Sequence, residues 1–228
     1  MIDRVAREKV TAAFEDFLDD KIMAFEFDER LQEIDSADQT VNEVVRAAWF
    51  HYDDCTDHKV RWSKEEWDYF QRLLLILRSD AELSPSHSRA KHWSWDHAVA
   101  WLACAAFAGT VLITGWSWQL FPLVALFGIL SISIDAYRQR QVRKPTPDEI
   151  ACFPFESISQ IRWLLRQTPG FQKRKCRPEL AGRAIRSEAA EGFNWTLSYC
   201  SWMLLSPVAL LIQGFPSRVD SPMRIIKR

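Results

Sequence analysis

The sequence predicts an all-α membrane protein: an N-terminal cytoplasmic three-helix unit, a transmembrane helical hairpin, a basic helical cytoplasmic loop and a third transmembrane helix. Two runs without any charged residue, Ala98–Ile134 and Gly192–Ser217, carry the membrane part of this prediction. A water-soluble domain of ordinary composition rarely has such runs, whereas a bilayer core is crossed by a helix of about 20 apolar residues. Apolar residues at helical spacing carry the rest.

Charge divides the chain as sharply as hydropathy does. Residues 1–97 hold 13 Lys and Arg against 22 Asp and Glu, net −9, and the remaining residues hold 16 against 8, net +8. The acidic region would repel phosphates, so we expect no nucleic-acid partner. The basic region adjoins the apolar runs, where anionic lipid head groups are the nearest partner. Five scattered cysteines are typical of a reducing compartment.

Residues 1–84 are expected to form an acidic helical domain. Residues 3–35 carry one apolar stripe without glycine or proline, and a second amphipathic helix covers Thr40–Cys55, beginning at a capping box. A third helix begins at the capping box of Ser63 and holds the aliphatic run Leu73–Leu77, which predicts a central position. Because this unit is small for a self-sufficient core, we expect it to pack on the rest of the chain, on a second copy or on an unknown protein partner.

The hairpin is expected at residues 97–134, after a linker at residues 85–96. Tryptophans cluster at both ends of its first segment, as they do at bilayer interfaces. The second segment follows the short connection Gly115–Trp118 and runs from Gln119 to Ile134. Four positive charges come directly after it, so both hairpin ends and the N-terminus are expected in the cytoplasm, with the protein in the inner or plasma membrane if it is bacterial.

A basic, partly amphipathic cytoplasmic loop is expected at residues 135–193. Thr146 begins a short helix with proline at its first position, and Phe155–Leu165 is an apolar-rich segment suited to the head-group plane. A last helix at residues 178–191 is expected to lead into the third membrane segment.

That third segment is expected at residues 194–215, followed by a basic tail at residues 216–228. If the segment spans the membrane, the basic tail lies outside, against the positive-inside trend. A re-entrant or interfacial segment removes this conflict. Length alone favours spanning.

Two basic patches are candidates for lipid head-group contact. For the first patch, fixing the topology is the simpler role, because cations resist translocation. Binding of anionic head groups is the sharper hypothesis for both. The first patch consists of Arg138, Arg140, Arg143 and Lys144, and the second of Lys173, Arg174, Lys175 and Arg177.

One cluster has the side-chain types of a metal site: His51, Asp54, Cys55 and His58. On a continuous helix these four residues would lie near one side, but the two histidines would stand about 10 Å apart along the axis. The simpler interpretation is a solvated helix end with Cys55 as a small core residue. We therefore expect no metal and no cofactor.

Motifs of familiar enzymes are missing from the sequence: there is no HExxH, GxSxG, GxGxxG or phosphate-binding loop. The preferred hypothesis is an integral membrane protein that acts as a membrane-anchored interaction or regulatory module. Two alternatives stay open. One is a metal-dependent hydrolase built around the His51–His58 cluster, and the other is an oligomeric pore-forming or membrane-perturbing effector.

Overall fold

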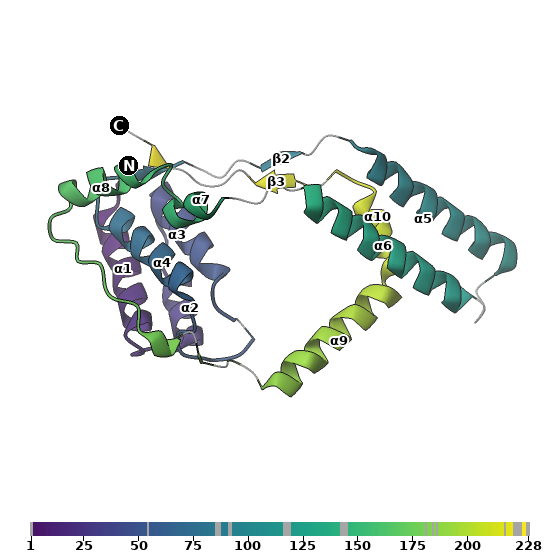
Figure 1. Cartoon of the computed structure of the whole chain (residues 1–228), viewed down its shortest axis with the longest axis horizontal. Helices are drawn as coiled ribbons and strands as arrows, with labels where there is room; N and C mark the ends of the chain where they lie inside the picture. Colours follow the sequence, from purple (N-terminus) through teal and green to yellow (C-terminus); the bar gives the residue numbers. More distant parts are fainter. Residues whose placement is uncertain are drawn as a thin grey trace. The chain divides into compact units, whose positions relative to one another are not determined.

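A computed structural model of the chain describes residues 2–53, 55–84, 88–90, 93–115, 120–141, 146–180, 182–183, 185, 187–216, 218–220 and 225–226. About 69% of the residues are helical, with almost no strand, which confirms the all-α prediction. The described residues fall into two compact units (Figure 1). The first unit combines residues from 1–87, 145–185 and 221–228, and the second combines residues from 88–144 and 186–220.

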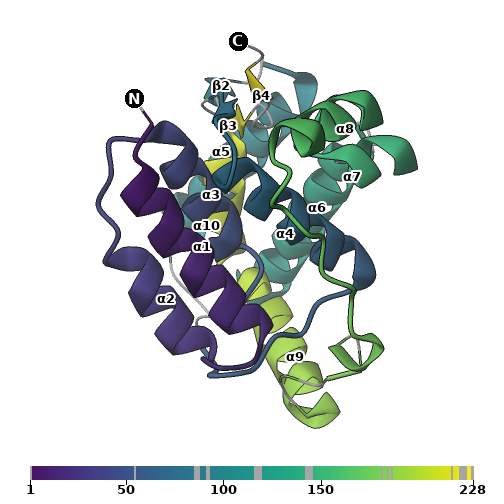
Figure 2. The same cartoon turned by 90° about the vertical axis from the view of Figure 1, so that its left-hand side faces the viewer.

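Four helices of the first unit, α1 to α4, lie side by side (Figures 1 and 2). Two later helices, α7 and α8, pack on α4. The elements are α1 (Arg4–Leu18), α2 (Ala24–Gln32), α3 (Gln39–Trp49), α4 (Lys64–Leu77), β1 (Glu82–Leu83), α7 (Pro147–Cys152), α8 (Ile158–Gln167), the 3-10 turn η2 (Pro178–Leu180) and β4 (Ile225–Ile226).

The single helix predicted for residues 3–35 is wrong, because α1 ends at Leu18 and α2 begins only at Ala24. Asp20, between them, has a φ of 58°, which a right-handed helix does not allow. Its carboxylate accepts two hydrogen bonds from Arg183, at 2.6 and 2.8 Å. A contact with a residue far along the chain therefore favours the break.

The predicted bounds of the second helix are also wrong. Asp38 caps α3 by accepting a hydrogen bond from the backbone N–H of Thr40, so the helix begins before the predicted capping box. It ends at Trp49 and does not reach Cys55. In contrast, the capping box of Ser63 with Glu66 is confirmed at the start of α4.

The core of the first unit is centred on α4, whose residues Leu73–Leu77 are all buried, as predicted. Aromatic rings fill the space towards α1 and α2; Phe17 stacks on Phe27 with centroids 4.5 Å apart. Residues of later segments complete the same core. They are Phe155, Leu164, Leu180 and Ile225.

The chain on either side of the third apolar run differs from the prediction. Residues 178–191 were expected to be helical throughout, but among the described residues the turn η2 is the one helical element before α9 begins at Glu188. Further on, β4 pairs antiparallel with β1, which places Glu82 opposite Ile226. This pairing joins residues after the last apolar run to the first unit.

The second unit contains two helices long and apolar enough to cross a membrane, α5 and α6. They have 20 and 21 residues and mean hydropathies of 1.7 and 1.4, and most of their surface is uncovered. Helix α6 runs past the predicted end at Ile134 to Gln141. The elements of this unit are β2 (Ser88–Ala90), α5 (Trp95–Thr114), α6 (Phe121–Gln141), α9 (Glu188–Leu204), α10 (Ser206–Gln213) and β3 (Arg218–Asp220).

The third apolar run forms the helices α9 and α10, bent by 75° relative to each other. Only together are the two helices long and apolar enough to cross a membrane, as a broken span or as a re-entrant loop. Helix α9 meets α6 where Gly128 faces Met203; a Cβ at Gly128 would lie 3.2 Å from the Met203 side chain. Strands β2 and β3 pair antiparallel beside these helices.

Candidate functional site

Three of the four predicted metal ligands, His51, Cys55 and His58, lie in the connection between α3 and α4, and not on a helix as expected. Asp54 lies outside the described residues. Cys55 is exposed, so its predicted position in the core is wrong, whereas His58 is buried. Across the described part of the chain, no group of three or more His, Cys, Asp or Glu side chains is placed to hold a metal ion.

His51 contacts aromatic side chains of the hydrophobic core. Its ring contacts the rings of Tyr69 and Phe70, with centroids 5.3 and 5.2 Å away, and its Nδ1 is 3.6 Å from the Glu66 carboxylate. Burial lowers the pKa of His51 and outweighs the opposing effect of Glu66. The neutral imidazole is thus the favoured form.

His58 organises its own loop. Its Nε2 accepts a hydrogen bond of 2.9 Å from the backbone N–H of Asp53, and its Nδ1 lies 2.7 Å from the carbonyl oxygen of Lys59. Both ring nitrogens are therefore engaged with backbone. Metal binding by His58 would require at least one of these contacts to break.

In the second basic patch, three of the four residues bind acidic side chains of the N-terminal helices. Lys175 is exposed. Arg183, further on, belongs to the same set of ion pairs, which holds the segment before α9 on α1 and α4. The pairs are Lys173–Asp68 (2.8 Å), Arg174–Asp19 (2.7 Å), Arg177–Asp20 (3.0 Å) and Arg183–Asp20 (2.6 Å).

These ion pairs keep the carboxylates charged. The hydrogen bond from Arg183 is the largest effect on Asp20 and holds its pKa below the ordinary value. Burial raises the pKa of Asp68, but the hydrogen bonds from Lys173 and Lys64 outweigh it, so the net shift is again downward. This face of the acidic unit is thereby neutralised by the chain's own cations.

Arg138, in the first basic patch, forms a buried ion pair inside the second unit. Its Nε lies 2.5 Å from a carboxylate oxygen of Asp96, and its guanidinium also donates to the carbonyl of Gln213 at 2.6 Å. The contact joins the start of α5, the end of α6 and the end of α10. Arg140 is exposed. Arg143 and Lys144 lie outside the described residues.

A second polar contact links α6 and α10 deeper in the same unit. The Ser131 hydroxyl donates to the side-chain oxygen of Gln213 at 3.1 Å, and the Gln213 amide donates to the Ser131 carbonyl at 3.1 Å. Both residues are buried. Such interhelical hydrogen bonds hold membrane helices together where no water competes.

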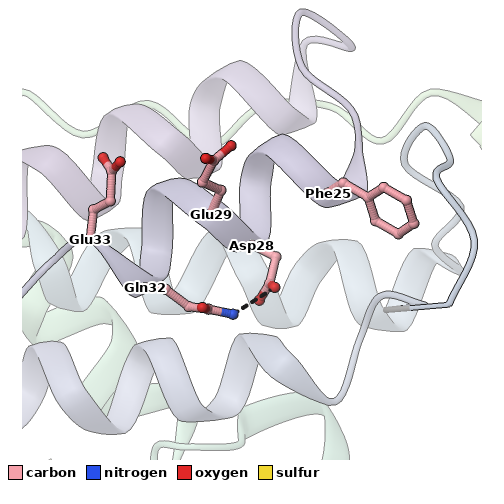
Figure 3. A pocket seen from close by; sticks show the side chains of 5 residues that line it. All are labelled: Phe25, Asp28, Glu29, Gln32 and Glu33. Carbon is pink, nitrogen blue, oxygen red and sulfur yellow. Dashed lines mark hydrogen bonds between the residues drawn. The ribbon is translucent and has the colours of Figure 1, made fainter.

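Another acidic surface lies on α2, and its residues Asp28, Glu29 and Glu33 form no ion pair within the described part of the chain. Phe25, Asp28, Glu29, Gln32 and Glu33 line a shallow depression of about 390 Å³ on one face of this helix (Figure 3). Within it, Gln32 donates a hydrogen bond of 2.7 Å to Asp28. The depression is open and polar, which suits a protein segment better than an enclosed small molecule.

Large aromatic side chains are exposed in this depression and at the end of α3. Phe25 of α2 is 47% exposed, and Trp49 and Phe50 at the end of α3 are 54% and 74% exposed. Tyr52, two residues after Phe50, donates a 2.5 Å hydrogen bond to Asp28 and so joins the end of α3 to α2. We call the residues lining the depression, together with Trp49 and Phe50, the acidic aromatic surface.

The acidic aromatic surface was not among the sites predicted from the sequence, because Phe25 and Trp49 fall on apolar stripes that predict core positions. The Asp96–Arg138 pair was also missed. A signal for it was present: the two residues stand at the open end of a predicted antiparallel hairpin, where opposite charges meet. Comparisons with models of known protein families, with curated proteins and with solved structures find no match.

Proposed function

We propose that the chain is a membrane-anchored interaction protein whose first unit binds a basic segment of a partner protein through the acidic aromatic surface. The observation that supports this best is the exposure of Phe25 among the acidic residues of α2, together with the exposure of Trp49 and Phe50 at the end of α3, which Tyr52 joins to Asp28. Exposed aromatic side chains are enriched at the energetic centres of protein interfaces. The helices α5 and α6 would hold this surface at the membrane.

Charge favours a basic partner. Glu29 and Glu33 are exposed one helical turn apart, where like charges repel each other. A cationic segment would relieve this repulsion and would be steered by the negative field of the unit. The chain offers an internal precedent, because its own Lys173, Arg174 and Arg177 already cover the acids of α1 and α4.

For topology, we propose that both ends of the α5–α6 hairpin, and with them the N-terminus, lie in the cytoplasm. The support is the group of positive charges at the end of α6, beginning with Arg138 and Arg140. Single cysteines at Glu65 and Thr146 in a cysteine-free chain should be protected from an impermeant maleimide in intact cells. Labelling of both positions would reverse the orientation.

We further propose that α9 and α10 form a re-entrant element and not a third span. Leu180, before the pair, and Ile225, after it, belong to one hydrophobic core. Two residues packed in the same water-exposed unit lie on the same side of a membrane. The chain between them therefore enters and leaves the bilayer on one side, which also removes the conflict between a third span and the basic tail.

Contacts inside the second unit agree with this path. At the bend, the Ser206 hydroxyl donates to the carbonyl of Val124, near the start of α6, at 2.9 Å. At the other end of α10, the carbonyl of Gln213 accepts from Arg138, near the end of α6. Helix α10 thus returns towards the open end of the hairpin. A cysteine at Arg218 that is labelled from the opposite side to one at Thr146 would refute the re-entrant path.

Site-specific photo-crosslinking in the native membrane tests the partner proposal. A photoreactive phenylalanine analogue at Phe50 should give a discrete adduct with another protein, and the cross-linked peptide should be basic by mass spectrometry. Charge reversal by Glu29→Lys and Glu33→Lys should reduce the adduct at least tenfold, because it replaces attraction by repulsion. Glu65→Lys, an exposed charge reversal on α4, is the matched control and should leave the yield unchanged.

Three outcomes would contradict the proposal. The first is no adduct at Phe50, and the second is an adduct whose yield is the same in the Glu29→Lys, Glu33→Lys variant and in the Glu65→Lys control. The third is an adduct between two copies of this chain, which would make the surface a self-association site.

A further inference from the structure

We propose that α8 is a second membrane contact, which lies on anionic phospholipid head groups on the side of the bilayer where α6 ends. The inference requires that α5 and α6 anchor the chain. It does not depend on the partner-binding surface proposed above.

Helix α8 is amphipathic, but its outward face is not simply polar. Gln160 and Leu164 point towards the core and are 6% and 1% exposed. On the outward side, Ile158 is 57% exposed, Trp163 is 43% exposed and Leu165 is 38% exposed. Packing on α4 thus accounts for one side of the helix and leaves three large apolar side chains uncovered.

Two arginines accompany these apolar side chains. At 100° per residue, Arg162 falls between Ile158 and Arg166 on the outward face, and Leu165 borders the same face. Both arginines are exposed. Within the part of the chain that the structure describes, neither forms an ion pair, whereas Lys173 and Arg174 nearby are neutralised by Asp68 and Asp19.

This composition suits a lipid surface better than a protein interface. Tryptophan and aliphatic side chains enter the boundary between head groups and acyl chains, and arginines bind the phosphates beside them. A basic residue near an anionic surface contributes roughly a fivefold increase in partitioning, so two contribute roughly 25-fold. Together with the apolar side chains, this is enough to hold a helix that is already tethered to the membrane.

Chain connectivity limits how far α8 can lie from the bilayer. Sixteen residues separate Gln141, at the end of α6, from Ile158. Fully extended, they would reach about 55 Å at most. The one helix described between them, α7, has six residues and is too short to cross a bilayer. We therefore place α8 on the same side of the bilayer as the end of α6, and the connection is long enough for α8 to reach the head groups.

The test uses the full chain in proteoliposomes, with all native cysteines replaced by serine and Ile158→Cys carrying an environment-sensitive nitrobenzoxadiazole fluorophore. Vesicles contain phosphatidylcholine alone, or phosphatidylcholine with phosphatidylglycerol in both leaflets, so the orientation of the protein does not affect the result. We expect the emission to shift to shorter wavelength only in the anionic vesicles. High salt should return the emission to the wavelength seen in phosphatidylcholine alone. The same fluorophore on Glu65→Cys should show no shift.

Variants assign the effect to α8. Arg162→Glu with Arg166→Glu should abolish the shift, because like charges repel the anionic surface. Lys175→Glu, another exposed charge reversal, is the matched control and should leave the shift unchanged. An equal spectrum in both kinds of vesicle would overturn the inference. So would loss of the shift in Lys175→Glu but not in the double arginine variant, because the contact would then belong to the second basic patch. A positive result together with no cross-link at Phe50 would leave α8 a lipid contact and remove the partner proposal alone.

Discussion

Asp38→Ala is expected to destabilise the first unit by about 4 kcal/mol, because it leaves the charge of Arg7 buried without its partner. The side chain of Arg7 is 1% exposed and that of Asp38 is 4% exposed, and their closest atoms, Nε and Oδ2, are 2.7 Å apart. The same guanidinium donates to the carbonyls of Ser79 and Ala81 at 2.8 and 3.0 Å. It therefore joins α1, the start of α3 and the segment after α4.

The magnitude follows from two effects of one side chain. Removing one partner of a buried ion pair costs about 3–5 kcal/mol, and removing the N-cap of α3 costs about 1 kcal/mol. The two overlap, since the same carboxylate serves both. In the double variant Arg7→Met, Asp38→Ala no charge is left unpaired, so we expect a loss of only about 1–2 kcal/mol, the sum of the lost cap and imperfect packing.

Amide hydrogen exchange of the detergent-solubilised chain measures this difference. Core amides of α1 and α4 exchange through unfolding of the unit, so 4 kcal/mol should speed their exchange about 10³-fold in Asp38→Ala. The double variant should exchange roughly tenfold faster than the parent. An increase below tenfold in Asp38→Ala, or equal exchange in the single and double variants, would refute the reasoning about a buried unpaired charge.

The same pair predicts how stability depends on pH. Burial raises the pKa of Asp38, but the hydrogen bonds from Arg7 and from the backbone N–H groups of Asp3 and Thr40 outweigh it, and its pKa lies below 3.8. A group whose pKa is lowered by folding stabilises the native state above its unfolded pKa. The contribution is therefore full at neutral pH and is lost as the pH falls below about 4.

Three further predictions concern other parts of the first unit. Leu74→Asp places a carboxyl group at a position that is 2% exposed and should lower the free energy of unfolding by several kcal/mol, measured by hydrogen exchange. Unchanged stability and expression would show that α4 is not central. Asp20→Asn should weaken the hydrogen bonds to Arg183, so that a protease cleaves the segment before α9 faster at neutral pH. Because the pKa of Asp20 lies below its ordinary value, acid below about pH 4 should speed cleavage of the parent protein in the same way. Elemental analysis should find no stoichiometric zinc, and one zinc per chain that disappears in His51→Ala and in His58→Ala would support the hydrolase alternative; His58→Ala should still cost about 1–3 kcal/mol through its two lost hydrogen bonds.

Local signals in the sequence predicted local structure well. The capping boxes at Ser63 and Thr146 join residues three positions apart, and both form where the sequence predicts them, whereas the box predicted at Thr40 does not form because Asp38 caps α3. The aliphatic run Leu73–Leu77 allows no exposed side on its helix, and its burial follows from composition alone. The uncharged runs likewise predicted the candidate spans, because bilayer thickness fixes the length of helix required.

Features that depend on distant partners could not be predicted in this way. The break between α1 and α2 is stabilised by Arg183, 163 residues after Asp20. The roles of Lys173 and Arg174 also depend on distant acids, because the same cations could bind lipid if those acids were elsewhere. Asp96 stood at a segment edge in the sequence, and only its contact with Arg138 distinguishes a buried ion pair from a solvated residue.

The shared core of Leu180 and Ile225 has a consequence for biosynthesis. Helices α1 to α4 leave the ribosome first, but β1 finds its partner β4 only after α5, α6, α9 and α10 have been made. Synthesis of the apolar helices therefore precedes closure of the first unit. Until then, β1 and part of the core stay open to chaperones and proteases. A ribosome that stalls within α9 would release a chain whose N-terminal helices cannot complete their packing, so quality control of the whole chain can act on its first unit.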